Sequence, residues 1–485
     1  MRFRTFHRYP AMVDIFSKVA DQERAVFLDS SKQNALGRYS VIAFAPWDSV
    51  RKQGKDVYVN DEVVGDTFSE ALQRLLEKHK KDYPAELFLS NPAIGFLSYG
   101  YGQELMDVSS RHPNRFSIDD AIFCFYHVYL VEDHEAHCLQ LVLQGEDESD
   151  AKMDELVAFL LTDAPQQGAS QAALQDAPQQ AAPQDAPQQA APQTPAGATK
   201  QYGYFTTSDY DAEGYMTAIQ KLIAYIVQGH TYIANMTRRL EIQSNVPPFP
   251  YYRVLREKNP APFAAYMNYG AYQILSSSPE QFLYVQDGNV RTKPIKGTRK
   301  KTQDAAVNQA MIEDLLHSPK ERSELLMVTD LERNDLNKVC VPGTVKVPQM
   351  YTLEEHETVY HMVNTVTGKL APQKNLLDLI QATFPGGSIT GTPKKRTMEI
   401  IDELENSPRH IYTGSLGYLT PDGQMNLNII IRTLLHQEDR YEIGVGGGIT
   451  CESDPAEEFE ETVQKAKALV DTFSALAAPE GESGV

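Results

Sequence analysis

The chain has 485 residues, 42% of them hydrophobic, and a formal net charge of −20 at pH 7. Its length allows about two to four globular domains, and its negative charge argues against nucleic acid as a partner. The four cysteines are widely scattered, which predicts no disulfide and a reducing compartment. Because no apolar run suits a signal peptide or a membrane helix, we expect a cytoplasmic protein that does not bind membranes.

Residues 1–162 are predicted to form a mixed α/β lobe with an antiparallel sheet. Alternating apolar residues indicate strands, and apolar residues at helical spacing indicate helices. The strands are expected at 25–29, 38–43, 93–99 and 122–130, and the helices at 67–81 and 153–161.

Residues 163–200 differ in composition from both neighbouring regions. The sequence Asp-Ala-Pro-Gln-Gln occurs three times there, with hardly an aliphatic side chain larger than alanine. Such a segment cannot bury a core, and it predicts a semi-extended linker rather than a recognition element.

After the linker, one helix and several strands are predicted. The helix covers 210–229 and closes at Gly229, and the strands cover 231–242, 264–275 and 281–293. The same order of a helix followed by strands recurs later in the chain. This order predicts an α+β fold with layered antiparallel sheets rather than a doubly wound parallel sheet.

Two later helices carry acidic side chains. The first begins at Ser318-Pro319 and contains Glu324. The second begins at Asp454-Pro455 and places Glu458 and Glu461 beside a buried stripe. That stripe is predicted to consist of Phe459, Val463, Ala466 and Val470. Carboxylates from two helices could share one Mg²⁺, although a solvated acidic face explains the same spacing.

The stretch 293–300 holds three lysines and one arginine around Gly297. In an acidic chain this cluster favours an anionic small molecule, although a solvated basic turn is the plainer interpretation. Two glycine-rich runs, 384–393 and 444–450, offer backbone amides to a carboxylate or are ordinary turns. The first run lacks the Lys-Ser/Thr of a P-loop, so no nucleotide is expected.

Taken together, these features resemble a known family. Six motifs, in chain order, are similar to those of the chorismate-utilising enzymes: Pro294–Thr298, Asp330–Asp335, Phe384–Gly391, Met398–Glu405, Gly446–Ile449 and the helix with Glu458, Glu461 and Lys465. The resemblance covers residues 210–473 and is weaker before them. It implies the family's α+β fold, with layered antiparallel β-sheets, outer helices and two lobes. The implied domains are an N-terminal lobe like that of anthranilate synthase component I (1–162), the linker (163–200), a chorismate-binding catalytic domain (201–476) and a flexible tail (477–485).

Within the family, the residue before Gly297-Thr298 separates two chemistries. Aminodeoxychorismate synthases resemble this chain in having a lysine there, Lys296, whereas anthranilate synthases carry a small residue. The run Asn259–Phe263 also favours the first group, while Arg299–Lys301 and Thr392–Thr397 depart from the usual family pattern. The alternatives are anthranilate synthase component I and, from another class, an inactive tryptophan-binding scaffold subunit.

The resemblance also implies the residues of the site. Glu324 and Glu461 would bind Mg²⁺, with Glu458 close by. Lys296 would be the nucleophile, and Glu280 the general acid and base. The remaining active-site residues would be Thr298, His361, Tyr412, Arg432, Gly446, Gly447, Gly448 and Lys465, all but His361 of them binding chorismate. A tryptophan-binding set, resembling strands of the family's N-terminal lobe, would be Ser30, Arg38, Tyr39 and Ser40.

The implied reaction converts chorismate and ammonia into 4-amino-4-deoxychorismate, which leads to 4-aminobenzoate and folate. Lys296 would attack C2 as the C4 hydroxyl leaves, and ammonia would then add at C4 and expel the lysine. A reactive lysine must be neutral, which we expect Mg²⁺, Lys293 or Lys300 to favour. Because the sequence has no room for a glutaminase or a lyase domain, a separate glutamine amidotransferase should supply the ammonia, and a separate lyase should finish 4-aminobenzoate.

Overall fold

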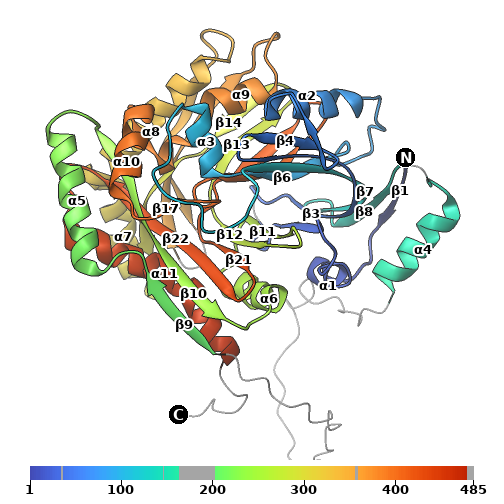
Figure 1. Cartoon of the computed structure of the whole chain (residues 1–485), viewed down its shortest axis with the longest axis horizontal. Coiled ribbons are helices and arrows are strands. Elements are labelled where there is room, and N and C mark those ends of the chain that lie inside the picture. Colours follow the sequence, from blue (N-terminus) through green and yellow to red (C-terminus); the bar gives the residue numbers. More distant parts are fainter. Residues whose placement is uncertain (34–35, 146, 163–202, 356–358, 478–485) are drawn as a thin grey trace, which may run out of the picture.

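The computed structural model describes residues 1–33, 36–145, 147–162, 203–355 and 359–477. The predicted linker and nearly all of the predicted tail lie outside these ranges. Over the described residues, 22 strands are joined by hydrogen bonds into one antiparallel network, and helices lie around it (Figure 1). This arrangement confirms the predicted α+β fold. In the same ranges, no helix combines the length and the apolar composition needed to cross a bilayer.

The elements predicted for the first 162 residues are all present. The region contains β1 (Arg2–Phe6), α1 (Met12–Ser17), β2 (Val26–Asp29), β3 (Tyr39–Gln53), β4 (Asp56–Val59), β5 (Glu62–Val64), α2 (Phe68–Lys78), β6 (Ala93–Leu97), α3 (Tyr99–Leu105), β7 (Ala121–Asp133), β8 (Cys138–Leu143) and α4 (Asp150–Leu161). Of these, β2, β3, β6, β7, α2 and α4 are the predicted elements, and the other six were not predicted. Strands β3 and β7 are longer than predicted because they pair with each other over almost their whole length.

After the linker, one helix is again followed by strands. The elements are β9 (Tyr204–Ser208), α5 (Ala212–Val227), β10 (Ile233–Ser244), α6 (Pro248–Lys258), β11 (Phe263–Asn268), β12 (Gln273–Ser278), β13 (Gln281–Gln286), β14 (Asn289–Thr292), β15 (Ile295–Lys300), α7 (Ala305–His317), α8 (Pro319–Asn337), β16 (Lys346–Glu355), β17 (Val359–Lys369), α9 (Leu376–Thr383), η1 (Gly387–Ile389), β18 (Gly391–Thr392), α10 (Lys394–Leu404), β19 (Ser415–Leu419), β20 (Met425–Asn428), β21 (Thr433–Gln437), β22 (Arg440–Ile449) and α11 (Pro455–Ala477). The predicted rhythm of the chain is therefore confirmed.

Two stretches predicted as single strands are hairpins. Residues 264–275 contain most of β11 and the start of β12. A turn at Gly270 (φ +74°) lies between the two strands. Residues 281–293 contain β13 and β14, joined at Asp287-Gly288, where both φ angles are positive. An Asp-Gly pair favours this tight turn. The turn was not predicted because apolar residues alternate on both sides of it, as they would in one continuous strand. The glycine-rich run 444–450 is also mostly strand, because it continues β22.

The regions before and after the linker share sheet and core. Strand β2 pairs with β11, and β6 pairs with β19. One hydrophobic cluster joins Phe16 and Phe27 from the first region with Tyr252 and Tyr266 from the second. The predicted domain boundaries stay a prediction, but the sheet is continuous across them.

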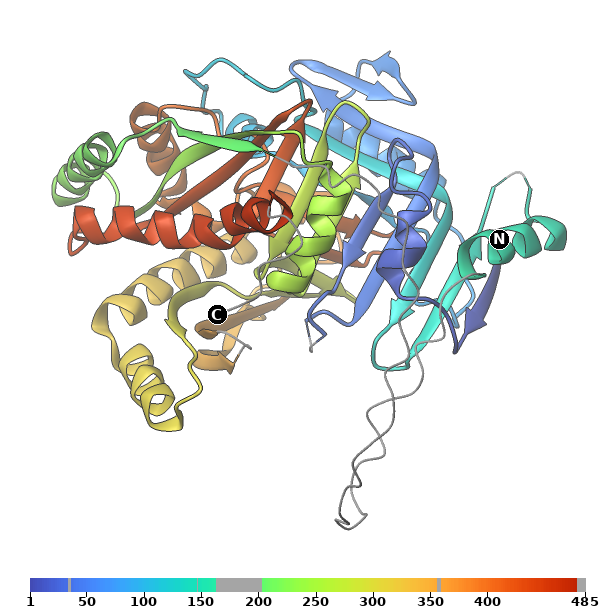
Figure 2. The same cartoon turned by 90° about the horizontal axis from the view of Figure 1, so that it is seen from below.

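Helix α11 packs against β22, α5 and α6, and Figure 2 shows it running across the molecule beside the β9–β10 strands. Its predicted buried stripe is partly wrong, because Val463 is 37% exposed. Ala466 is buried as predicted, and Glu458 and Thr462, which were not predicted in the stripe, are buried as well. The helix is rotated in this way because its polar residues have partners inside: Arg238 Nε, for example, donates to Thr462 Oγ1 (2.8 Å).

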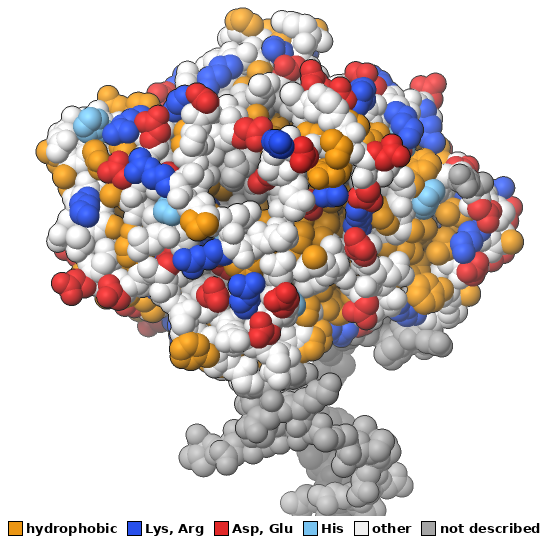
Figure 3. Space-filling model, viewed as in Figure 1, with side chains coloured by type: hydrophobic (Ala, Val, Ile, Leu, Met, Phe, Trp, Pro, Cys, Tyr) orange, Lys and Arg blue, Asp and Glu red, His pale blue; other side chains and the backbone are white. Residues whose placement is uncertain are grey.

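Helix α8 begins as the sequence predicts. Pro319 occupies its first turn, and the Ser318 side chain accepts a hydrogen bond from the Glu321 N–H. Its buried face, which includes Glu324, Val328 and Glu332, lies against β15 and β17. On the face in Figure 3, lysine and arginine side chains alternate with aspartate and glutamate and form no broad positive surface there.

Candidate active site

A cavity of about 590 Å³ lies between strands β10, β15, β17 and β22 and helices α8 and α11. It is lined by every predicted catalytic, substrate-binding and metal-binding residue except Gly447, namely Glu280, Lys296, Thr298, Glu324, His361, Tyr412, Arg432, Gly446, Gly448, Glu458, Glu461 and Lys465. The fold therefore brings together side chains that the sequence spreads over most of the region after the linker.

Two glycines of β22 leave room for this cavity. A β-carbon at Gly448 would lie 2.9 Å from Lys296 Nζ and 3.2 Å from Glu324 Oε2. A β-carbon at Gly447 would lie 3.0 Å from Glu458 Oε2 and 3.2 Å from a Glu461 oxygen. Any other residue would push a side chain into the space between the lysine and the carboxylates. Gly447 thus shapes the site although it does not line the cavity.

The pairing of β22 also exposes backbone amides. The N–H of Asn235 bonds to the Thr390 oxygen, and the N–H of Thr237 bonds to Glu405, so both point away from β22. Their partners Gly448 and Gly446 therefore direct their own N–H and C=O groups away from β10. Along that side β22 pairs with β21 only as far as Ile443. The Gly446 carbonyl accepts a hydrogen bond from Lys465 Nζ (2.8 Å). The backbone N–H groups of Gly446 and Gly448 face the cavity.

Three glutamates form an acidic wall. Lys320 Nζ and Ser453 Oγ donate to Glu458 at 3.1 and 2.7 Å, and burial together with the Glu461 charge raises the pKa of Glu458. Although burial opposes ionisation of Glu461, Lys465 at 2.5 Å holds its pKa below the usual value. Glu324 is 5% exposed, and burial raises its pKa to about 7.

This wall fits a divalent cation. Glu324 makes no hydrogen bond or ion pair with any described residue. Only the charges of Lys296 and Lys320 favour its ionised form, so a cation bound beside it would stabilise the carboxylate further. Among the described residues, no three His, Cys, Asp or Glu side chains are already gathered as a closed metal site. The arrangement therefore suits Mg²⁺, which takes one or two protein carboxylates and completes its shell with other oxygens.

Lys296 lies on β15 next to a β-bulge. The register against β17 shifts between Lys296 and Thr298, with Gly297 as the extra residue at φ +78°. A side chain at Gly297 would meet Leu315 Cδ1 at 2.7 Å. The bulge re-aims the strand, so that both Lys296 and Thr298 line the cavity. Thr298 Oγ1 is hydrogen-bonded to Nδ1 of His361 on β17 at 2.9 Å.

Glu280 lies just after β12 and is deeply buried. Ser388 Oγ donates to its carboxylate at 2.7 Å. Burial raises the pKa of Glu280, while Ser388 and the Lys296 charge oppose that shift. A carboxyl group whose pKa is raised in this way is better able to give and take a proton during a reaction.

The basic stretch around Lys296 is largely paired. Lys293 forms an ion pair with Glu354, and Arg299 pairs with Asp314 and Glu321. Glu354 offsets part of the Lys293 charge, and the role of Lys293 as a cation next to the reactive amine stays a prediction. Lys300 does line the cavity. The stretch forms strand β15 rather than a solvated basic turn.

The Tyr412 ring and Arg432 also line the cavity. A β-carbon at Gly444 would overlap the Tyr412 ring, and the Arg239 guanidinium lies 4.9 Å from that ring's centroid. Arg432 has a φ of +50°, and burial lowers its pKa. A non-glycine residue in this conformation is strained, which fits a side chain held in place for a ligand.

Some residues that line the cavity are not marked by any sequence motif. Asn235 lies inside a predicted strand with no motif to mark it, and Ser388 lies within a glycine-rich run. Lys320 had a usable signal, because it precedes Glu324 by one helical turn and so lies on the same face of α8.

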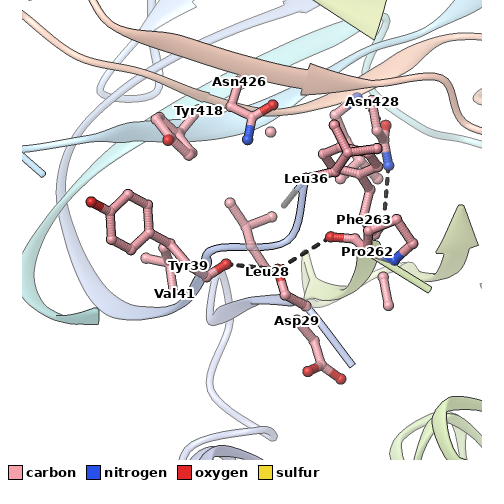
Figure 4. A pocket seen from close by; sticks show the side chains of 14 residues that line it. Leu28, Asp29, Leu36, Tyr39, Val41, Pro262, Phe263, Tyr418, Asn426 and Asn428 are labelled. Carbon is pink, nitrogen blue, oxygen red and sulfur yellow. Dashed lines mark hydrogen bonds between the residues drawn. The ribbon is translucent and has the colours of Figure 1, made fainter. Parts of the chain in front are cut away.

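A second, much smaller pocket of about 40 Å³ lies at two of the four predicted tryptophan-binding residues (Figure 4). Ser30 and Tyr39 line it, whereas Arg38 pairs with Asp133 and the Ser40 hydroxyl accepts from the Ser30 N–H. This volume has room for a few water molecules at most. Binding of an indole would therefore require Leu36, Tyr39 or Phe263, which surround the pocket, to move. Tryptophan binding stays a prediction.

The cavity suits a small anionic substrate. We compared the chain with known proteins to see whether their functions fit this interpretation. The family model described as "chorismate binding enzyme" matches residues 23–471. The chain therefore belongs to the chorismate-binding enzyme family, as predicted.

Two relatives represent the two branches of interest. Anthranilate synthase component 1 of Spirochaeta aurantia is 32% identical over 454 residues, 92% of this chain and 90% of that protein. Aminodeoxychorismate synthase component 1 of Bacillus subtilis is also 32% identical, over 469 residues, 94% of this chain and 93% of that protein. The crystal structure of anthranilate synthase component I from Streptococcus pneumoniae has a TM-score of 0.75 and 26% identity, covering 90% of this chain and 93% of that one.

Proposed function

We propose that the chain is an aminodeoxychorismate synthase component I, which converts chorismate and ammonia into 4-amino-4-deoxychorismate for 4-aminobenzoate and folate synthesis. The observation that carries this proposal is the position of Lys296. Its amine reaches the gap beside Gly448, with the Glu324 carboxylate at the same gap. An anthranilate-type reaction has no need of an amine at this place.

The first step uses Lys296 and Glu280. The neutral amine forms a bond from Nζ to C2 of chorismate, the ring double bonds shift, and the C4–O bond breaks. Glu280 protonates the departing hydroxide, so that water leaves. In the second step ammonia bonds to C4, the double bonds shift back, and the C2–N bond breaks. The net reaction is chorismate plus ammonia to 4-amino-4-deoxychorismate plus water. Holding the amine beside the ring gives it a high effective molarity.

The cationic and amide groups of the cavity would hold the substrate's two carboxylates. Arg432 and Lys465 supply charge, and the amides of Gly446 and Gly448 supply donors. Glu324 and Glu461 would hold Mg²⁺, with Glu458 beside them, in keeping with the general magnesium dependence of the family. When bound, the metal would screen the ring carboxylate.

Ammonia should come from a second protein. Relatives are named "component 1", which supports a partner component, and we infer that this partner is a glutamine amidotransferase. A separate lyase would convert the product to 4-aminobenzoate. We place these reactions in the cytoplasm.

Product analysis tests the proposal. The purified chain is incubated with chorismate, Mg²⁺ and ammonium, and the products are identified by liquid chromatography and mass spectrometry, with and without an added 4-amino-4-deoxychorismate lyase. We expect a product that keeps its enolpyruvyl group and yields 4-aminobenzoate only when the lyase is present. Anthranilate as the main product would refute the proposal.

Anthranilate synthase component I is the second candidate, because relatives with that name are as similar as those of the first type. In that reaction ammonia adds at C2 and pyruvate is eliminated. Lys296 would then only pair with a carboxylate, and a Lys296→Ala variant would keep most of its turnover.

A further inference from the structure

We propose that Asn235, to which the sequence assigned no role, contacts the substrate: its carboxamide binds the group that is exchanged on the ring beside Lys296, first the leaving hydroxyl and then the incoming ammonia. The identity of these two groups rests on the proposed function, whereas contact between Asn235 and chorismate does not.

The burial of Asn235 is the first reason. The residue is 8% exposed and lines the cavity. Its side chain makes no hydrogen bond with any described residue. Other buried asparagines have partners: Asn268 donates to the Ala20 carbonyl, and Asn364 donates to Thr329. The Asn235 amide opens onto the cavity rather than being enclosed without a partner, so both its donor and its acceptor are available to a ligand that enters there.

The direction of the side chain is the second reason. Asn235 on β10 lies directly opposite Gly448 on β22. Because the Asn235 N–H bonds to Thr390 on the other side, this is a non-hydrogen-bonded antiparallel pair, in which the two side chains share one face and lie closest together. The β-carbon direction at Gly448 points to Lys296 Nζ and to Glu324. The Asn235 amide therefore faces the same gap.

The backbone of Asn235 is also firmly held. Its carbonyl accepts a hydrogen bond from Arg409 at 2.6 Å, and Arg409 is itself paired with Glu405 in the interior. A side chain on such a support has few alternative positions, which suits recognition of one substrate atom.

The chemistry of the amide is the third reason. Carboxylates at the gap can only accept hydrogen bonds, and the Lys296 ammonium can only donate them. Asn235 can donate to the oxygen of a hydroxyl and accept from an N–H of ammonia. It can thus bind both the group that leaves and the group that enters, without changing its own protonation.

The test uses the full-length protein with three variants. Asn235→Leu keeps the shape and removes all hydrogen bonding, whereas Asn235→Asp keeps the shape and removes the donor. Asn268→Leu is the matched control, because Asn268 is equally buried in a strand but lies outside the cavity and has partners. The measurements are the melting temperature, kcat and KM for chorismate and for ammonium, and the rate of mass adduct formation on Lys296 without ammonia.

We expect Asn235→Leu to melt near the wild-type temperature and to lose about 10- to 100-fold in kcat/KM for chorismate, with a raised KM for ammonium. Asn235→Asp should slow adduct formation by about 10-fold or more. The Asn268→Leu control should melt lower with unchanged KM values. A folded Asn235→Leu variant whose kcat/KM for both substrates stays within about threefold of wild type would overturn the inference.

Should Asn235→Leu fail to fold, Asn235→Asp decides, and an unchanged adduct rate in that variant would overturn the inference. The proposed function fails separately. If the wild type makes anthranilate, the proposed function is wrong, yet a loss of kcat/KM for chorismate in Asn235→Leu still establishes the contact. If the wild type makes 4-amino-4-deoxychorismate and the variants are unaffected, only the inference about Asn235 is wrong.

Discussion

The two pockets of this molecule differ in how their polar groups are satisfied. In the large cavity, the side chains of Glu324 and Asn235 make no hydrogen bond to any residue that the structure describes, and glycines keep the space open. In the small pocket, Ser30 Oγ donates to the carbonyls of Tyr39 and Pro262, and Asn428 donates to Phe263 (Figure 4). Buried groups without partners mark a site that needs a ligand, whereas paired groups mark one that already stabilises the fold.

The largest effect is expected from removing the charge of the acidic wall. Glu324→Gln and Glu461→Gln should each abolish measurable turnover, because a two-carboxylate Mg²⁺ site does not tolerate losing either charge. Glu324→Gln should also unfold no more easily than wild type, since an uncompensated buried charge is removed. Steady-state kinetics over a range of Mg²⁺ concentrations and thermal melting check both points.

Glu457→Gln is the control, because Glu457 lies exposed on the first turn of α11. It should behave as wild type. Normal activity of Glu324→Gln at low Mg²⁺ would contradict the assignment of this carboxylate to the metal.

A smaller but still large effect is expected from filling the gap at Gly448. Gly448→Ala would place a methyl group 2.9 Å from Lys296 Nζ, and a displacement of about 1 Å at a reacting group can cost about 100-fold in rate. We expect kcat to fall about 10- to 100-fold with little change in melting temperature. Gly65→Ala, where a β-carbon meets nothing within 4 Å, should have no effect, and equal kcat for both variants would show that the gap is not used.

The next prediction concerns the pH dependence of stability at Glu332, a buried glutamate that interacts with the charge of Glu280. Burial and the Glu280 charge raise the pKa of Glu332 to about 8, with Thr292 donating to it and Asp335 and Lys394 nearby. Because the folded state holds this proton to higher pH than the unfolded chain, stability falls between pH 5 and 8, roughly from the unfolded to the folded pKa. Glu332→Gln keeps the acceptor for Thr292 and does not titrate.

The stability of Glu332→Gln relative to wild type should therefore rise with pH across that window, by at most ~1.4 kcal/mol per pH unit. Urea unfolding at pH 6 and pH 8 measures the difference. A difference that is the same at both pH values would mean that Glu332 does not titrate there.

The smallest effect is expected at the other pocket. Ser30→Ala removes two hydrogen bonds to backbone carbonyls and should lower the free energy of unfolding by ~1–2 kcal/mol. Activity with chorismate and ammonium should be unchanged, because Ser30 does not line the large cavity. A loss of turnover without a loss of stability would show that the two pockets are coupled.

Much of the fold could be predicted from the sequence because its elements are strongly patterned. Helix α8 starts where Ser318-Pro319 predicts, and the strands alternate as expected. The hairpin turn at Asp287-Gly288 was missed because alternation continues through it. Val463 was wrongly predicted as buried, because apolar spacing alone cannot show that Glu458 and Thr462 take the inner face.

The site was predicted in a different way. Lys296, Glu324 and Glu461 came from the resemblance to a family, whereas spacing alone favoured a solvated acidic face over a metal site. Asn235 could not be found, since its significance lies in what it lacks, a partner, and in its position opposite Gly448. Both facts depend on long-range strand pairing, which no local pattern records.

The proposed function claims that Lys296 becomes covalently bound to the substrate, and mass spectrometry can detect that bond. The wild-type protein is mixed with chorismate and Mg²⁺ in the absence of ammonia, quenched, and examined by intact-mass analysis and peptide mapping. We predict an adduct on the peptide that contains Lys296, absent from Lys296→Ala, which should also lose 4-amino-4-deoxychorismate formation by several orders of magnitude. No adduct, together with a Lys296→Ala variant that keeps most of its activity, would contradict the claim.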